Sequence, residues 1–98
     1  MIVTVLEGRV EQGQEQAIVG AYRDAASRPR PAGLLRSELQ RDARDPTQWR
    51  IQTWWSSREA LDAMRRAGTP EGVLMFRAAG AEPALALFEI IERIDAGG

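Results

Sequence analysis

The segment 49–67 constrains the fold of this chain most, because its hydrophobic period changes halfway along. Residues 49–55 alternate between two faces, which is the period of a β-strand. The residues that follow place apolar side chains at helical spacing. The sequence therefore predicts a strand that leads directly into a helix. The face of this strand that we expect to lie under helices carries Trp49, Ile51, Thr53 and Trp55.

Two helix starts are marked by residues that can accept backbone hydrogen bonds. Ser56 can cap the helix that follows the strand, and Glu59 can reach back to the Ser56 amide, as in a capping box. Thr69 is predicted to cap a further helix, with Pro70 at its first helical position. Gly68, between the two helices, is typical of the position just beyond a helix end.

Periodicity and turn residues predict the remaining elements. β-Branched residues begin the chain, and apolar residues at helical spacing around Ile18 and Tyr22 follow them. Pro29 and Pro31 end that helix, and an Asp-Pro pair marks a hairpin loop. We predict strands at 2–9, 33–42, 49–55 and 85–94 and helices at 14–27, 57–67 and 70–80.

This order of elements matches the split βαβ, ferredoxin-like arrangement. We therefore predict an α+β fold with a four-stranded antiparallel sheet and helices on one face only. The chain of 98 residues is expected to form a single domain over residues 1–95, with a frayed end at 96–98. We expect apolar residues from every strand on the uncovered face. Such a patch predicts a homodimer through the open sheet face.

The composition excludes several chemistries. The chain has no Cys, His, Lys or Asn, so it lacks thiolate nucleophiles, imidazole bases and Schiff-base lysines. Its acidic residues do not cluster at metal-ligand spacing, and we predict no metal site. The net charge of −1 gives no reason to expect nucleic acid as a partner. No apolar run reaches membrane-spanning length, so we expect a cytoplasmic protein with no membrane partner.

Three motifs, in this order along the chain, resemble one known family. They are Pro-x-Gly-Leu-Leu-x-Ser at Pro31–Ser37, the Asp-Pro hairpin at Asp45–Pro46, and Trp-x-Ser-x-Glu-Ala-Leu at Trp55–Leu61. Together they are similar to the antibiotic biosynthesis monooxygenase (ABM) family of dimeric α/β barrels, over nearly the whole chain. The resemblance implies two ferredoxin-like units paired sheet against sheet, each with a small cavity between sheet and helices. It also implies oxygenation of an aromatic quinol by O2 without a cofactor; other relatives degrade haem, convert small metabolites or have no assigned activity.

The resemblance transfers to individual residues only in part. Trp55 matches the tryptophan that borders the cavity in quinol-oxygenating members. Ile51 stands where those members have a substrate-binding asparagine, and Leu61 replaces a tyrosine on the following helix. The haem-degrading branch needs a histidine ligand and an early asparagine, and Met64 stands near the position of its helix tryptophan. The resemblance therefore argues against haem degradation.

Apolar candidates for ligand contacts lie on the predicted strand and the helix after it. Trp55 either stacks on a planar aromatic ligand or fills core volume with its own ring. Thr53 and Ile51 share its face, and Met64 on the next helix is a further candidate. Trp54 points the other way, to the expected dimer face, where tryptophan is enriched.

The polar candidates each have a functional and a structural interpretation. Tyr22, the single tyrosine, orients a phenolic substrate or sits in the core with a bonded hydroxyl. Ser37 binds a ligand or packs among leucines, and Arg77 holds a developing negative charge or lies on the surface. Glu7 and Glu89 are the candidate bases if either faces the cavity, because burial raises a carboxyl pKa. The alternative for both is solvation at a strand edge or pairing with Arg9 or Arg93, and no catalytic residue is assigned.

Two functions from different classes fit these observations. The first is a cofactor-independent monooxygenase that holds a small aromatic quinol or polyketide-type substrate against Trp55 and oxidises it with O2. The second is a non-catalytic dimeric module that binds a small hydrophobic or aromatic ligand. The missing asparagine and tyrosine motivate the second. A weaker third hypothesis is a dimer that serves only as a scaffold for a partner.

Overall fold

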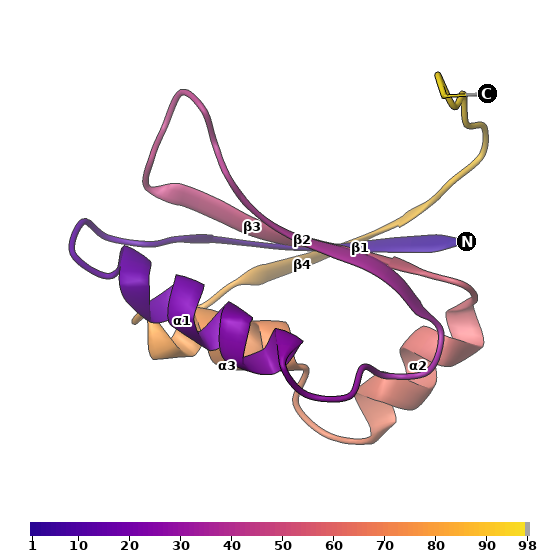
Figure 1. Cartoon of the computed structure of the whole chain (residues 1–98), viewed down its shortest axis with the longest axis horizontal. Helices are drawn as coiled ribbons and strands as arrows, with labels where there is room; N and C mark the ends of the chain where they lie inside the picture. The colour runs from indigo at the N-terminus through magenta and orange to yellow at the C-terminus, as the bar shows by residue number, and fades with distance from the viewer. Residues whose placement is uncertain (98) are drawn as a thin grey trace.

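The structure of the protein is a computed structural model that describes residues 1–97. Its four strands form one antiparallel sheet in the order β2-β3-β1-β4, and its three helices cover one face of that sheet (Figure 1). The predicted α+β, ferredoxin-like fold is therefore confirmed. Within residues 1–97 no helix is long and apolar enough to cross a membrane. The elements are β1 (Ile2–Arg9), α1 (Glu15–Ala26), β2 (Leu34–Arg41), β3 (Gln48–Trp55), α2 (Arg58–Arg66), α3 (Glu71–Ala78) and β4 (Ala84–Glu89).

The predicted alternation of β3 is confirmed by burial. Trp49, Ile51, Thr53 and Trp55 are all buried on the helix-covered face. The pairing of β1 with β3 places Ile2 beside Trp55, Thr4 beside Thr53, Leu6 beside Ile51 and Gly8 beside Trp49. Because side chains of paired residues share a face, β1 and β3 together form the floor on which the helices pack.

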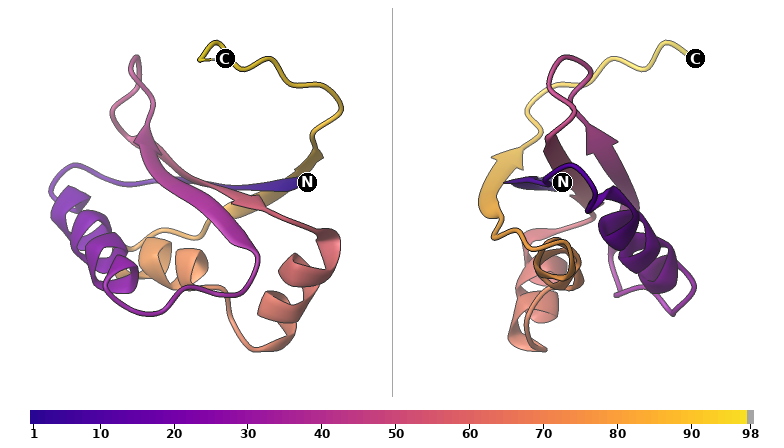
Figure 2. Two further views of the ribbon diagram at one scale, coloured as in Figure 1. Left: turned by 45° about the vertical axis from the view of Figure 1, so that its right-hand side comes forward. Right: turned by 90° about the vertical axis from the view of Figure 1, so that its left-hand side faces the viewer.

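The helices divide this floor into two apolar clusters. α1 and α3 pack against each other and cover one end of the sheet, while α2 covers the other end (Figures 1 and 2). The first cluster surrounds Phe76 and Ile18, which are fully buried, and includes Trp49 and Ile51. The second contains Ile2, Trp55 and Leu61. The strip of sheet between the two clusters is therefore where polar side chains can approach the helices.

The start of α2 differs from the prediction by one residue. Ser57, not Ser56, is the N-cap, and its Oγ accepts a hydrogen bond of 3.1 Å from the amide of Ala60. Ser56 instead donates its backbone N–H to the carbonyl of Gly33 at 2.8 Å, a bond that joins the two residues just beyond the paired ends of β2 and β3. Gly33 has φ +85°, and a Cβ there would lie 2.4 Å from the Cβ of Ala60. Only glycine allows α2 to approach β2 this closely.

The start of α3 and the end of β4 also differ from the predictions. Pro70, not Thr69, is the N-cap of α3, because its ψ of 140° is extended rather than helical. The last strand ends at Glu89 rather than Ile94. Glu89 pairs with Ile2, the first residue of β1, so both strands of this ladder stop at the same pair. The predicted frayed end includes Gly98, which lies outside the described residues.

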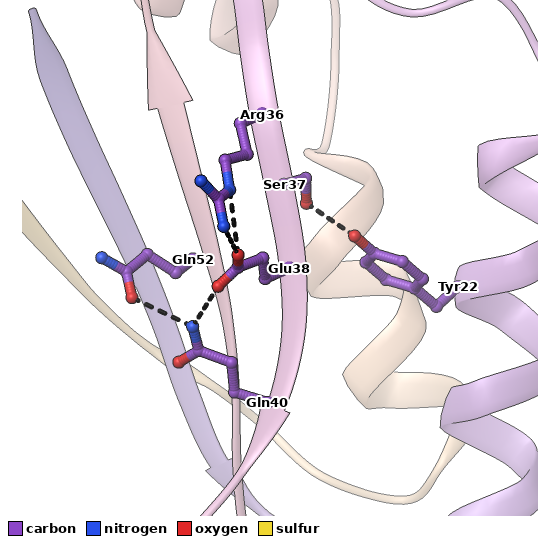
Figure 3. A network of polar contacts seen from close by, with 6 residues as sticks. All are labelled: Tyr22, Arg36, Ser37, Glu38, Gln40 and Gln52. Carbon is purple, nitrogen blue, oxygen red and sulfur yellow. Dashed lines mark hydrogen bonds and ion pairs between the residues drawn. The ribbon is translucent and has the colours of Figure 1, made fainter. Parts of the chain in front are cut away.

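The uncovered face is apolar on one half only. Val3 and Val5 of β1 and Phe88 of β4 face this side, together with Trp54. The expectation of apolar residues from every strand is wrong for β2, which presents a linked polar group (Figure 3). That group consists of Arg36, Glu38 and Gln40 of β2 with Gln52 and Arg50 of β3, joined by side-chain hydrogen bonds. Exposed polar side chains suit β2 because it is an edge strand.

Candidate functional site

Three hydroxyl side chains lie in one row across the helix-covered face of the sheet. Ser37 of β2 pairs with Thr53 of β3, and Thr53 pairs with Thr4 of β1. Directly paired side chains on one face have Cβ atoms about 5 Å apart. The row lies between the two apolar clusters, so it is the polar strip left between the two helix groups.

Tyr22 of α1 joins this row from above the sheet. Its hydroxyl donates a hydrogen bond of 3.0 Å to Ser37 Oγ (Figure 3). Ser37 Oγ also accepts a long contact of 3.4 Å from Thr53 Oγ1. Thr4 and Thr53 are each only 8% exposed. We call Thr4, Tyr22, Ser37 and Thr53 the hydroxyl cluster. Three of the predicted site residues, Tyr22, Ser37 and Thr53, are thus brought together.

Trp55 adjoins the hydroxyl cluster and is covered by protein atoms. Its indole Nε1–H donates to Thr4 Oγ1 at 3.1 Å. The residue is 3% exposed and packs in the second cluster with Leu61 and Met64. An internal cavity large enough for water would leave part of this ring accessible. In this conformation, therefore, a ligand stacks on Trp55 only after side chains of the second cluster, such as Met64, move aside.

The remaining apolar candidate, Ile51, is one row away from the hydroxyl cluster. It is 5% exposed and belongs to the first cluster, beneath α1 and α3. Leu61, which replaces the family tyrosine, is 1% exposed in the second cluster. Neither side chain carries a polar atom, so both can shape a site but neither can hydrogen-bond a ligand.

Arg77 is not joined to the hydroxyl cluster in this structure. Its Nε and Nη2 donate to the two carboxylate oxygens of Glu82 at 3.0 and 2.9 Å. This pairing raises the pKa of Arg77 and lowers the pKa of Glu82, chiefly through the hydrogen bonds. Both side chains are more than half exposed. Two of the guanidinium donors are therefore committed to a surface ion pair.

The two candidate bases are exposed, but the register places them on different faces of the sheet. Glu7 points to the uncovered face, where it pairs in register with Arg50. Glu89, the last residue of β4, pairs with Ile2 and so belongs to the helix-covered face, one row from Thr4, where it is exposed at the end of the strand. Within residues 1–97, neither carboxylate makes a hydrogen bond to a member of the hydroxyl cluster. The polar groups that meet beneath the helices are therefore hydroxyls and one indole, without a carboxylate bonded to them.

A separate depression of about 460 Å³ opens at the end of the β2–β3 hairpin. Its walls combine the arginines Arg41, Arg44 and Arg50 with the acids Glu7 and Asp42. The lining is charged and open to solvent, so it does not resemble the apolar cavity that the sequence predicts beside Trp55.

Sequence reasoning missed Thr4 as a member of the site. The alternation of residues 2–9 places Thr4 on the same face as Ile2 and Leu6. Its role depends on the pairing with Thr53, and that register is not encoded locally. The signal in the sequence was that Thr4 is a hydroxyl residue between the apolar Ile2 and Leu6 on the same strand face.

The fold and the hydroxyl cluster together define the class of protein. This is a ferredoxin-like domain with one uncovered sheet face and a small polar site enclosed between sheet and helices. The family profile described as antibiotic biosynthesis monooxygenase matches residues 1–69. The chain belongs to the antibiotic biosynthesis monooxygenase family, as the three sequence motifs predict. No curated protein matches the sequence.

Solved structures share the fold at low sequence identity. A proposed antibiotic biosynthesis monooxygenase from Nitrosomonas europaea superposes with a TM-score of 0.72 at 18% identity, over 94% of this chain and 100% of that one. A mutant of SnoaB, a cofactor-independent oxygenase from Streptomyces nogalater, gives 0.71 at 18% identity, over 95% of each chain. A possible oxidoreductase from Bacteroides thetaiotaomicron gives 0.69 at 22% identity, over 91% of this chain and 96% of that one. At these identities the likeness establishes the fold.

Proposed function

We propose that this protein is a cofactor-independent monooxygenase that oxidises a small aromatic quinol or polyketide-type substrate with O2. The observation that carries the proposal is the hydroxyl cluster beside Trp55, enclosed by two apolar clusters. Membership of the monooxygenase family and the likeness to SnoaB support the reaction type. Polar groups in an apolar surrounding suit a flat ring that carries oxygen substituents.

The reaction needs no electron donor other than the substrate. For an anthrone, the ring CH2 group loses two hydrogens and gains one oxygen atom of O2 as a carbonyl. The second oxygen atom leaves as water together with those two hydrogens. The four electrons that reduce O2 therefore all come from the substrate carbon, and the products balance without a cofactor.

The protein contributes position, exclusion of water and hydrogen bonds to the substrate oxygen. Substrate deprotonation comes first, because the anion gives up an electron to O2 more readily than the neutral form. Hydroxyls aimed at the substrate oxygen stabilise this anion in a site of low dielectric. Trp55 and the apolar clusters would hold the ring in place. Since Glu7 and Glu89 are exposed, we assign neither of them as the base, and the proton is expected to pass to water before the site closes around the ring.

Oxygen consumption tests the proposal directly. Purified protein is mixed with a panel of hydroquinones and anthrones, and O2 uptake is followed with an electrode, with heat-unfolded protein as the blank. We expect uptake with at least one compound and a product that contains one atom from ¹⁸O2. Absence of enzyme-dependent uptake across the panel would reject the oxygenase.

The second candidate function is a non-catalytic module that binds a small hydrophobic or aromatic ligand. Two observations favour this binding module. Trp55 is almost completely covered by protein atoms, and the side chains of Ile51 and Leu61 are apolar and supply no reactive or hydrogen-bonding group. Ligand-dependent increases in melting temperature, without O2 uptake or product, are the expected result in that case.

We also propose that the protein acts as a homodimer through its open sheet face. In the isolated chain Phe88 is 54% exposed on this face. Residues 90–97 leave the sheet on the side opposite the helices (Figures 1 and 2), with Ile91 and Ile94 79% and 95% exposed. A second copy is the occupant that would cover these apolar groups. A cytoplasmic location stays a prediction.

Sedimentation tests the dimer. Phe88→Arg places a charge in the middle of the proposed interface and should convert dimers into monomers at micromolar concentration. Arg44→Ala, in the hairpin loop, is the control and should leave the dimer intact. A wild-type protein that sediments as a monomer at high micromolar concentration would rule out this interface.

A further inference from the structure

The hydroxyl cluster contains more hydrogen-bond donors than its own contacts use. Each contact between two hydroxyls uses one hydrogen, whichever group donates it. Tyr22, Ser37 and Thr53 bring three hydroxyl hydrogens and share two contacts, so one hydrogen stays free. Thr4 accepts from the indole of Trp55 and therefore keeps its own hydrogen free as well.

The free hydrogen of Thr4 lies where water is scarce, because Thr4 is 8% exposed. Ser37 accepts both contacts from its neighbours and keeps its own hydrogen, and it is half-buried. Apolar clusters flank the row on both sides. Across residues 1–97, the only side-chain hydrogen bonds of these four hydroxyls are the three named above. A donor that is left unpaired in an apolar surrounding is unfavourable. The site is therefore complementary to a ligand that brings acceptor oxygens.

The surrounding side chains restrict the kind of ligand further. Within residues 1–97, no carboxylate or guanidinium group is bonded to the cluster. The neighbouring groups are the indole of Trp55 and aliphatic side chains such as Leu61 and Met64. Neutral donors within an apolar frame suit oxygen atoms carried on a hydrophobic ring rather than a free, highly charged anion.

We propose that the hydroxyl cluster is a donor site that selects planar ligands with acceptor oxygens on the ring, such as quinone carbonyls, over ligands of the same shape without them. The proposal rests on the proposed function for the position of the ligand beneath the helices. It does not require turnover, because the selection acts on binding. Ser37, which accepts both contacts and keeps its own hydrogen free, is the specificity-determining residue that it adds to Trp55.

A pair of matched ligands tests this selection. 1,4-Naphthoquinone and 1,4-dimethylnaphthalene have the same ring and similar outlines, but methyl groups replace the two carbonyl oxygens. The chain has no cysteine thiol or lysine amine that could trap a quinone covalently. Dissociation constants come from NMR titration, in which amide shifts of Thr4, Ser37 and Thr53 also locate the ligand. We expect the quinone to bind at least about fivefold more tightly, the effect of one additional hydrogen bond.

A triple variant removes the interlinked hydroxyls without leaving one of them unpaired. In Tyr22→Phe with Ser37→Ala and Thr53→Val, the partners disappear together, so the fold should persist. We expect affinity for the quinone to fall about fivefold, while affinity for 1,4-dimethylnaphthalene stays within about twofold. Thr69→Val, the same chemical change at an exposed loop position, is the matched control and should change neither value.

Each outcome decides the inference separately from the oxygenase proposal. Loss of quinone preference in the triple variant supports the donor site, whether or not the protein consumes O2. The donor site is rejected if the wild type binds neither ligand, or if it binds both equally. It is also rejected if the triple variant loses affinity for both ligands to the same extent. Oxygen uptake with an unchanged quinone preference in the variant would keep the oxygenase and reject the donor site.

Discussion

The covered and uncovered faces of the sheet are built from the same strands, yet adjacent residues meet opposite conditions. Trp55 is 3% exposed among Ile2, Leu61 and Met64, with its indole N–H bonded to Thr4. Trp54, the residue before it, lies on the uncovered face, where the guanidinium carbon of Arg36 sits 5.1 Å from its ring centre. Trp55 is therefore held by burial, whereas Trp54 is held in part by a neighbour that water can replace.

Substitution of the two tryptophans should give the largest difference between the faces. Trp55→Ala removes a buried ring and leaves Thr4 without its donor, which costs about 3–5 kcal/mol of unfolding free energy. Trp54→Ala should cost about 1 kcal/mol in the isolated subunit, because Trp54 is only partly buried and its cation–π contact is weak. Urea denaturation at low protein concentration measures both. Equal losses would contradict the distinction between the faces.

On the covered face, the effects of single substitutions in the hydroxyl cluster on stability should not add up in the triple variant. Ser37→Ala leaves the hydroxyls of Tyr22 and Thr53 without a shared partner and should cost about 1–3 kcal/mol. The triple variant with Tyr22→Phe and Thr53→Val removes all three hydroxyls and should be closer to wild type in stability than Ser37→Ala alone. Thermal unfolding of the single and triple variants makes the comparison. A triple variant that loses the sum of the single effects would show that the hydroxyls act independently.

The helix above Trp55 offers a smaller test. Ser57→Ala removes the side-chain acceptor for the Ala60 amide and should cost about 1 kcal/mol. Ser56→Ala should cost less, because the bond of Ser56 to Gly33 uses its backbone N–H and survives the change. Urea midpoints for the two variants distinguish the cap that the structure shows from the one that the sequence predicts.

A substitution on the uncovered face should have the smallest effect on stability, and this effect should depend on pH and salt. Hydrogen bonds from Gln40 and Arg36 hold the pKa of Glu38 below its ordinary value. A carboxyl with a lowered folded-state pKa stabilises the protein above its unfolded pKa, and this contribution disappears as pH falls through the folded value. Glu38→Gln should therefore remove a small, salt-sensitive part of the acid dependence of stability. Urea titrations at neutral and acidic pH, at low and high salt, measure this; identical profiles would contradict it.

Much of the fold could be predicted from local patterns. The alternation of residues 49–55 identified a strand and its covered face because one face of the sheet is buried, and burial enforces a period of two. The helical stripe around Ile18 and Tyr22 predicted α1 for the same reason. Family motifs between Pro31 and Leu61 pointed to the family that the profile match establishes.

The sequence could not settle features that depend on partners elsewhere in the chain. Ser56 and Ser57 are equally good caps locally, and the choice follows from the bond of Ser56 to Gly33 just beyond the paired strand ends. Alternation continues past Glu89, but the strand stops there because β1 begins at Ile2. Thr4 joined the candidate site only through the register of β1 on β3.

The free edge formed by β2 limits how copies of this protein can associate. Leu34 and Arg36 flank a break in its register with β3, and charged side chains follow along the strand. Irregular, charged edges resist the addition of another strand. Edge-to-edge association of further copies along β2 is therefore disfavoured. The double variant Arg36→Val with Glu38→Val would be expected to form fibrillar aggregates more readily.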